Sequence, residues 1–147
     1  MSMIHDRVEA ARSGMNPAVI CQMASGWVVL SDLQYLRGYS ILLPDPVVDS
    51  LNALGPEGRS GYLGDMALVG DALLEVTGAF RINYAVLGNS DPALHAHIIP
   101  RYLSEPDELR RGLPWSYSQE AMHAVPFEPE RDRALMEQIA RAIQRRL

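Results

Sequence analysis

The sequence predicts an α+β domain in which helices pack on a mostly antiparallel sheet of five strands. Five short segments are rich in β-branched and aromatic residues and are bounded by turn-forming glycine, serine and proline. Apolar residues recur at helical spacing before, between and after these segments. The chain has 147 residues, which suits one domain of ordinary size, so we expect a single domain over residues 1–147.

The first third of the chain predicts one helix and three strands. In residues 2–12 apolar side chains recur at helical spacing, and Ser13 and Gly14 then stop the helix. Three strands are predicted at residues 19–23, 27–30 and 39–43. Because Gly-containing turns separate them, we expect an antiparallel meander.

The middle of the chain predicts one long helix and two further strands. A broad apolar stripe over residues 60–77 indicates a helix, with Gly78 as its stop. A single helical turn over residues 49–54 and a Gly-Pro-Glu-Gly breaker at residues 55–58 precede it. The fourth and fifth strands are predicted at residues 80–87 and 94–101.

The C-terminal part has a different character. Residues 104–129 are polar and rich in proline, with isolated aromatic side chains, which predicts an irregular excursion over the surface. Residues 129–147 predict a final helix whose basic end suits the helix dipole. We therefore expect the core of the domain at about 18–102 and an irregular segment with a helix at 103–147.

Composition excludes several classes of function. A net charge of −5 and a pI near 5.3 argue against a nucleic-acid partner. The sequence contains no lysine, so Schiff-base chemistry and a P-loop lysine are excluded. No apolar run approaches the roughly 20 residues that span a bilayer, and the first residues resemble no secretory signal, so we expect no membrane partner and a cytoplasmic location.

The chemistry-bearing residues concentrate in the fifth predicted strand. His95 and His97 are two residues apart, so strand alternation places both rings on one face. The turn directly before them, Gly-Asn-Ser-Asp-Pro at residues 88–92, can direct backbone N–H groups, an amide and a hydroxyl to one point. A neutral imidazole is a competent nucleophile toward phosphorus. If His97 or a backbone carbonyl accepts the N–H of His95, the other nitrogen of His95 keeps its lone pair for attack.

Two other interpretations of the histidine pair remain open. A His-x-His on a strand is often a structural or chance surface pair, and it is sometimes half of a metal site. Zinc would require a third ligand, and no nearby cysteine or glutamate offers ligand spacing. We therefore expect no metal and no cofactor.

Residues 88–101, GNSDPALHAHIIPR, resemble the signature of the histidine triad (HIT) superfamily, His-x-His-x-His followed by two apolar residues and often Pro-Arg. The block from Ser31-Asp32 to Pro44 is similar to a second landmark of that family, an acid before a strand that ends in proline. The resemblance covers residues 27–102 and implies a HIT-like fold. It also implies that His95 is the nucleophile that becomes nucleotidylated and that His97 is the third histidine. Ala93 stands at the first position, so this chain has a dyad in place of a triad.

The resemblance implies further binding residues. Asn89 and Ser90 match the phosphate-contacting positions, Asn83 best matches an asparagine that reaches the α-phosphate, and Asp32 matches the ribose-binding acid. Tyr39 stands where many members carry another histidine. The turn at residues 88–92 is also similar to the loop of galactose-1-phosphate uridylyltransferases, which transfer a nucleotidyl group to a sugar phosphate.

Small members of this family are homodimers whose C-terminal segments help to form the partner's pocket. The resemblance therefore implies a homodimer and a use for Trp115 and Tyr117 there, whereas simple packing of a long loop is the alternative.

The sequence thus supports three hypotheses. The first is a hydrolase or nucleotidyl transferase that attacks the α-phosphate of a nucleoside polyphosphate, a phosphoramidate or a dinucleoside polyphosphate such as diadenosine polyphosphate, through a nucleotidyl-histidine. The second is a catalytically weak nucleotide-binding protein that lacks the first triad histidine. The third is a zinc-dependent protein.

Overall fold

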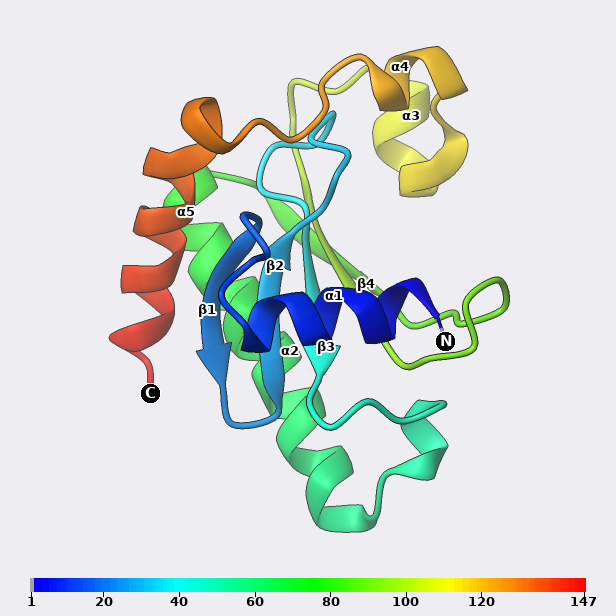
Figure 1. Cartoon of the computed structure of the whole chain (residues 1–147). Coiled ribbons are helices and arrows are strands. Elements are labelled where there is room, and N and C mark those ends of the chain that lie inside the picture. Colours follow the sequence, from blue (N-terminus) through cyan, green and yellow to red (C-terminus); the bar gives the residue numbers. More distant parts are fainter. Residues whose placement is uncertain (1) are drawn as a thin grey trace.

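The computed structural model describes residues 2–147. Its centre is one sheet of five strands in the order β1-β2-β3-β5-β4, and all neighbouring strands are antiparallel (Figure 1). The strands are β1 (Val19–Met23), β2 (Gly26–Leu30), β3 (Ser40–Pro44), β4 (Arg81–Ala85) and β5 (Ala96–Arg101). The predicted α+β class with a five-stranded antiparallel sheet is confirmed.

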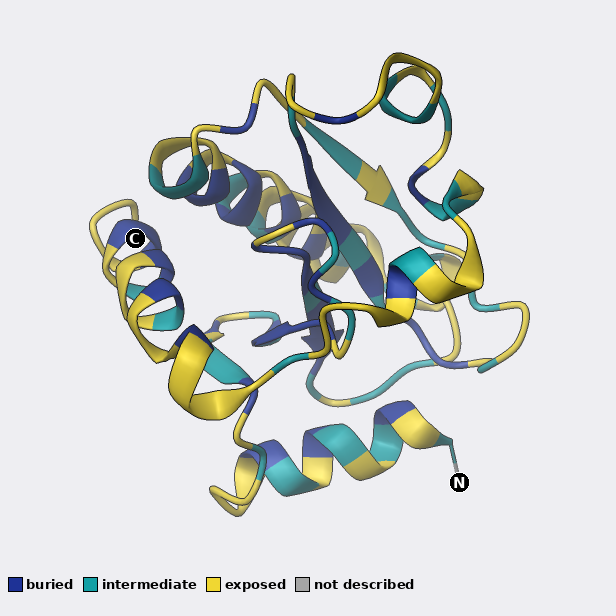
Figure 2. Ribbon diagram, turned by 90° about the horizontal axis from the view of Figure 1, so that it is seen from above, coloured by how far each residue is buried: buried dark blue, intermediate teal, exposed yellow. Residues whose placement is uncertain are grey.

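Helices cover both faces of this sheet. α2 (Pro56–Thr77) and α5 (Pro129–Gln144) lie on one face, and α1 (Met3–Arg12) lies on the other (Figure 2). Strand alternation divides the apolar residues between two cores. Val28, Leu42 and Ile98 pack with α2 and α5, whereas Val29 and Leu43 pack with Ile4 and Val8 of α1.

The long helix begins earlier than the sequence predicts. α2 starts at Pro56, inside the segment that we expected to act as a breaker, and Gly55 is its extended N-cap residue. Proline is well suited to the first turn of a helix, because the missing N–H would have no partner there and its φ is already helical. The prediction of a breaker through residue 58 was therefore wrong.

The fifth strand also begins later than predicted. Leu94 and His95 precede β5, because the backbone N–H of Leu94 donates to the carbonyl of Val48 at 2.8 Å instead of joining the sheet. The connection between β3 and α2, which contains the short 3-10 turn Leu51–Ala53, is thereby held against the segment that carries the histidines. The predicted fourth strand is likewise shortened to residues 81–85.

The excursion over residues 104–129 is more regular than the sequence predicts. It contains the short helices α3 (Asp107–Arg111) and α4 (Gln119–His123) and a 3-10 turn at Pro114–Ser116. Helices of about one turn are too short to show an apolar period and depend on tertiary contacts. α5 ends at Gln144 rather than at residue 147. No helix within residues 2–147 is both long enough and apolar enough to cross a membrane.

Candidate functional site

The two histidines share one face of the sheet, as the sequence predicts. His97 lies in β5 between Ile41 of β3 and Ala85 of β4. His95 directly precedes the strand, and its ring contacts that of His97 edge to face with 5.0 Å between ring centroids. Leu94, Ala96 and Ile98 alternate with them and are buried on the opposite side.

A hydrogen bond fixes the tautomer of His95. Its Nδ1 lies 2.8 Å from the carbonyl oxygen of Ala93. Because a carbonyl only accepts, Nδ1 carries the proton in the neutral ring. Nε2 therefore keeps its lone pair, which is the arrangement that a nucleophilic imidazole requires.

His97 is held more deeply. Its Nδ1 lies 2.6 Å from the hydroxyl of Tyr39, and the indole of Trp115 contacts its ring edge to face at 5.3 Å between centroids. Burial, together with the nearby His95, lowers the pKa of His97 to about 4. Its imidazole is therefore neutral at pH 7.

The loop after β4 forms a hollow beside both rings. This cavity of about 300 Å³ is lined by His95, His97 and residues 87–91, which include Asn89 and Ser90. Gly88 adopts a φ of +76°, which a residue with a side chain rarely reaches, and this allows the tight turn. Asp91 accepts a hydrogen bond from the backbone N–H of Ile4 at 3.2 Å and so ties the loop to α1. The structure thus brings four of the predicted site residues together.

A second, larger hollow adjoins the first. It measures about 450 Å³ and shares Leu87, Gly88 and His95 with the loop hollow. Residues 49–52 supply its other wall, with Val86 and residues 92–94. Sequence reasoning gave residues 49–52 no functional role, and no local signal could have done so, because their position depends on the bond from Leu94 to Val48.

Two predicted site residues lie elsewhere. Asp32 is exposed and forms an ion pair with Arg7 of α1, and it lines neither hollow. The side-chain oxygen of Asn83 accepts from Nη1 of Arg101 at 2.7 Å. Asn83 pairs with Ile99 in the β4–β5 ladder, next to the Ala85–His97 pair on the same face, and it lines neither hollow.

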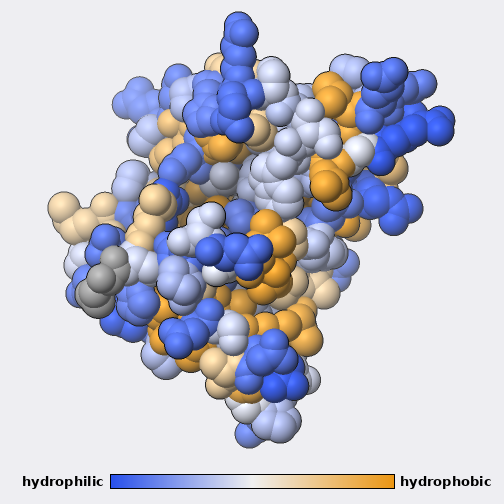
Figure 3. Space-filling view, turned by 90° about the vertical axis from the view of Figure 1, so that its right-hand side faces the viewer, coloured by the Kyte–Doolittle hydropathy of each residue, from blue (hydrophilic) through white to orange (hydrophobic). Residues whose placement is uncertain are grey.

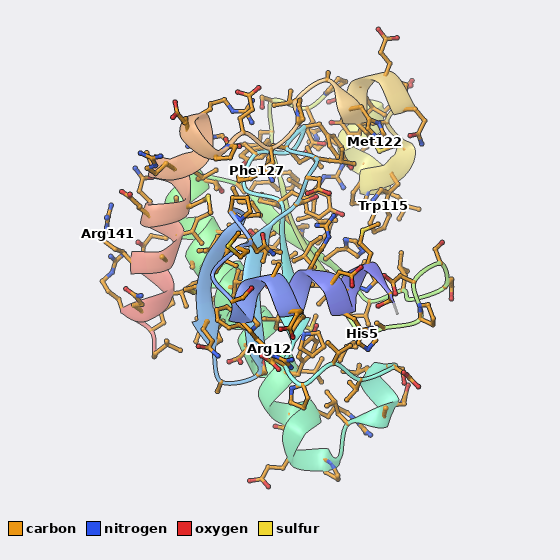
Figure 4. The ribbon with its side chains drawn as sticks, viewed as in Figure 1. His5, Arg12, Trp115, Met122, Phe127 and Arg141 are labelled. Atoms are coloured by element: carbon orange, nitrogen blue, oxygen red, sulfur yellow. The ribbon has the colours of Figure 1, made fainter. Side chains whose placement is uncertain are left out.

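The excursion packs on the same chain. Trp115 contacts His97, and the hydroxyl of Tyr117 donates to Oε1 of Glu105 at 2.6 Å. In Figure 4, Trp115 lies on the side of the excursion that faces the N-terminal end of α1, near the labelled His5. These contacts lie within one chain, and the use of Trp115 and Tyr117 in a partner's pocket stays a prediction.

A buried ion pair anchors this excursion. Nη2 of Arg101 and Oε1 of Glu105 are 3.0 Å apart, and the two side chains are only 2% and 5% exposed. Arg101 also donates to the carbonyls of Leu109 and Gly112. The pair therefore connects the end of β5 to the segment that carries Trp115.

Figure 3 shows the right-hand side of the molecule as it is drawn in Figure 1. The loop after β4 projects toward this side. Orange hydrophobic residues interrupt its largely blue, hydrophilic surface. Within the described part of the chain, no group of three or more His, Cys, Asp or Glu side chains is placed to hold a metal ion.

Comparison with known proteins finds likeness in structure. No family model matches the sequence, and no curated protein matches it. A histidine triad (HIT) protein from Sinorhizobium meliloti superposes with a TM-score of 0.71 at 25% identity, over 84% of this chain and 87% of that one. A histidine triad protein from Marinobacter aquaeolei superposes with a TM-score of 0.75 at 22% identity, over 99% and 98% of the two chains.

A third solved structure is described as a hypothetical histidine triad nucleotide-binding protein from Sulfolobus tokodaii. It has a TM-score of 0.72 at 14% identity, over 95% of this chain and 92% of that one. All three proteins share the architecture described above over most of their lengths, so the fold that the signature implies is confirmed.

Proposed function

Because the chain is, by its fold and its strand signature, a member of the histidine triad superfamily, we propose that it binds a nucleotide and cleaves it at the α-phosphate, with His95 as the nucleophile. The observation that carries this proposal is the bond from Nδ1 of His95 to the carbonyl of Ala93, which in the neutral ring leaves the lone pair on Nε2, beside the loop hollow. A polar cradle next to an activated nucleophile is the arrangement that group transfer requires.

The proposed reaction has two steps. Nε2 of His95 attacks the α-phosphorus, a P–N bond forms, and the P–O bond to the leaving group breaks with its electron pair on the departing oxygen. Water, or another acceptor hydroxyl, then attacks the same phosphorus and loses its proton, the P–N bond breaks, and His95 is restored. The leaving groups that we propose are the remaining phosphates of a nucleoside polyphosphate or of a dinucleoside polyphosphate.

Residues around the hollow stabilise the phosphate in this proposal. The amide of Asn89 and the hydroxyl of Ser90 donate to the nonbridging oxygens. Asp32 accepts from the ribose hydroxyls after its exposed contact with Arg7 opens, and exposed ion pairs of this kind contribute only about 0–1 kcal/mol. Asn83 is the third proposed donor, through Nδ2, because only its Oδ1 is occupied, by Nη1 of Arg101.

The second candidate is a nucleotide-binding protein with little turnover. It is favoured by one observation, the absence of an imidazole at Ala93, where the family carries its first histidine. Both candidates predict nucleotide affinity, and they differ in whether a covalent adduct forms.

Mass spectrometry after brief exposure to a panel of nucleoside and dinucleoside polyphosphates separates the two candidates. We expect a mass increase of one nucleotidyl group, a nucleoside monophosphate less one water, located on His95, and its loss in His95→Ala. His123→Ala is the matched control, because His123 is exposed in α4 and we expect its variant to form the adduct normally. Calorimetric binding of AMP without adduct or turnover would favour the binding protein, and no binding, adduct or turnover would refute both candidates.

A further inference from the structure

Tyr39 contacts His97 from outside the loop of residues 87–91 that lines the hollow. It directly precedes β3, is only 3% exposed, and its ring lies 5.8 Å from that of His97 between centroids. Its hydroxyl oxygen is 2.6 Å from Nδ1 of His97, a distance typical of a well-formed hydrogen bond. Tyr39 lines neither hollow, so it acts on the site only through this ring.

The surroundings of Tyr39 decide which atom carries the shared proton. A hydroxyl can donate or accept, so Nδ1 of His97 could in principle be either partner. Among residues 2–147, the hydroxyl of Tyr39 has no other hydrogen-bond acceptor. If Nδ1 donated, the proton of a buried hydroxyl would have no acceptor, which costs free energy. The hydroxyl therefore donates, and Nδ1 accepts.

This direction determines what His97 offers to a ligand. A neutral imidazole that accepts at Nδ1 carries its proton on Nε2. Nε2 has no partner in the described part of the chain, and the ring lines the loop hollow with Asn89 and Ser90. His97 therefore presents an N–H donor on the side where His95 presents a lone pair.

The contacts around the ring prevent it from turning. Trp115 and His95 meet it edge to face, and Tyr39 lies against it at a tilt of 60°. The buried Arg101–Glu105 pair holds the segment that carries Trp115. The donor is therefore oriented before any ligand arrives, which is the condition for efficient electrostatic stabilisation.

We propose that Tyr39 is a positioning residue that fixes His97 as the neutral Nε2–H tautomer, so that the site offers one imidazole lone pair and one imidazole donor to the phosphate. Tyr39 thereby orders a site in which Ala93 leaves only two histidines. The catalytic consequence rests on the proposed function, whereas the tautomer is a property of the free protein.

The charge state of His97 supports this assignment. The titratable groups that face the ring or share its hollow are His95, Tyr39 and Asp91. Burial lowers the pKa of His97 to about 4, and burial also raises the pKa of Tyr39. Both groups are therefore neutral between about pH 5 and pH 8, and the donor persists through that range.

Nuclear magnetic resonance of the free protein tests the tautomer without any substrate. The nitrogen chemical shifts of the His97 ring should identify a protonated Nε2 and an unprotonated Nδ1, unchanged from pH 5 to pH 8. A protonated Nδ1, or titration of His97 near pH 6.5, would overturn the proposal even if the protein proves to be an active hydrolase.

Three variants test the consequence for activity. In Tyr39→Phe we expect a mixture of His97 tautomers and a fall in kcat of about tenfold to a hundredfold with a smaller change in KM, because a fraction of the rings no longer presents the donor. Tyr39→His, which again places a hydrogen-bonding ring there, should recover part of kcat. Tyr62→Phe removes a comparable buried bond, from the Tyr62 hydroxyl to the carbonyl of Leu42 at 2.7 Å, on the other side of the sheet and should change neither the His97 spectrum nor kcat.

A Tyr39→Phe protein with the wild-type His97 tautomer and full kcat would show that Tyr39 serves packing alone. If the wild-type protein shows the expected tautomer but no turnover on any nucleotide, the proposed function fails and the tautomer assignment stands.

Discussion

Ala93 shows why this site has two histidines in place of three. Ala93 lies in the connection between β4 and β5. Its side chain is fully buried and packs against helix α1 in the cluster that contains Ile4 and Val8. The bond from Ile4 to Asp91 keeps α1 close to that loop. A ring at position 93 would therefore occupy space that α1 already fills.

We expect Ala93→His to lower the free energy of unfolding by about 1–3 kcal/mol through overpacking, without a gain in turnover. Urea unfolding and nucleotide turnover measure the two effects. Ala67→His, at an exposed position on α2, is the matched control and should cost little stability. A gain in turnover at unchanged stability would contradict this account and would indicate that the site has room for a first histidine.

At the scale of elements, the excursion after β5 owes its order to one buried charge pair. Burial alone would raise the pKa of Glu105, but the hydrogen bonds from Arg101, Tyr117 and the Tyr102 backbone outweigh it, so the pKa lies below the ordinary 4.5. A carboxyl whose pKa is lower in the folded state stabilises that state above its unfolded pKa. This contribution is lost as the pH falls through the folded pKa, so acid should release the excursion.

We expect Glu105→Gln to destabilise the protein by about 3 kcal/mol, because it leaves Arg101 buried without its charge partner. Thermal unfolding between pH 3 and pH 7 should show that the stability of the variant falls less with acid than that of the wild type, because the variant lacks this carboxyl. Glu108→Gln, an exposed position in α3, provides the control. Equal stability of Glu105→Gln and wild type at pH 7 would show that the pair does not hold the excursion.

The elements themselves differ in how far the sequence predicts them. The strand positions and the long helices follow from local periodicity and turn residues, and they were predicted to within a few residues. α3 and α4 were missed, because helices of five residues carry no period. The start of α2 was misplaced, because Pro56 was interpreted as a breaker although it fits a first turn.

At the scale of the whole molecule, β4 is an open edge of the sheet with apolar residues around it. The exposed hydrophobic side chains of β4, its flanks and α2 are Leu63, Leu74, Phe80, Tyr84 and Leu87. An exposed edge of this kind invites pairing with another strand. The family resemblance predicts a homodimer, and this edge is where we expect two copies to pair.

We expect Tyr84→Arg to shift the protein from dimer to monomer in sedimentation velocity, because a charge at the centre of an apolar interface is costly. Tyr84 is 45% exposed, so the fold should tolerate the change. Met15→Arg, at an exposed residue after α1, should leave the dimer intact. A wild-type protein that sediments as a monomer at all concentrations would exclude this interface.

Local sequence patterns were enough to predict the class of the fold, the order of its main elements and the placement of His95 and His97 on one face. These properties follow from alternation, helical periodicity and turn chemistry, which act between residues close together in the chain. Long-range packing establishes that Tyr39 and Trp115 hold His97, that α1 covers Ala93, and that Arg101 binds Asn83. Each of these contacts joins residues far apart in the sequence, and it depends on how packed elements meet rather than on any local pattern.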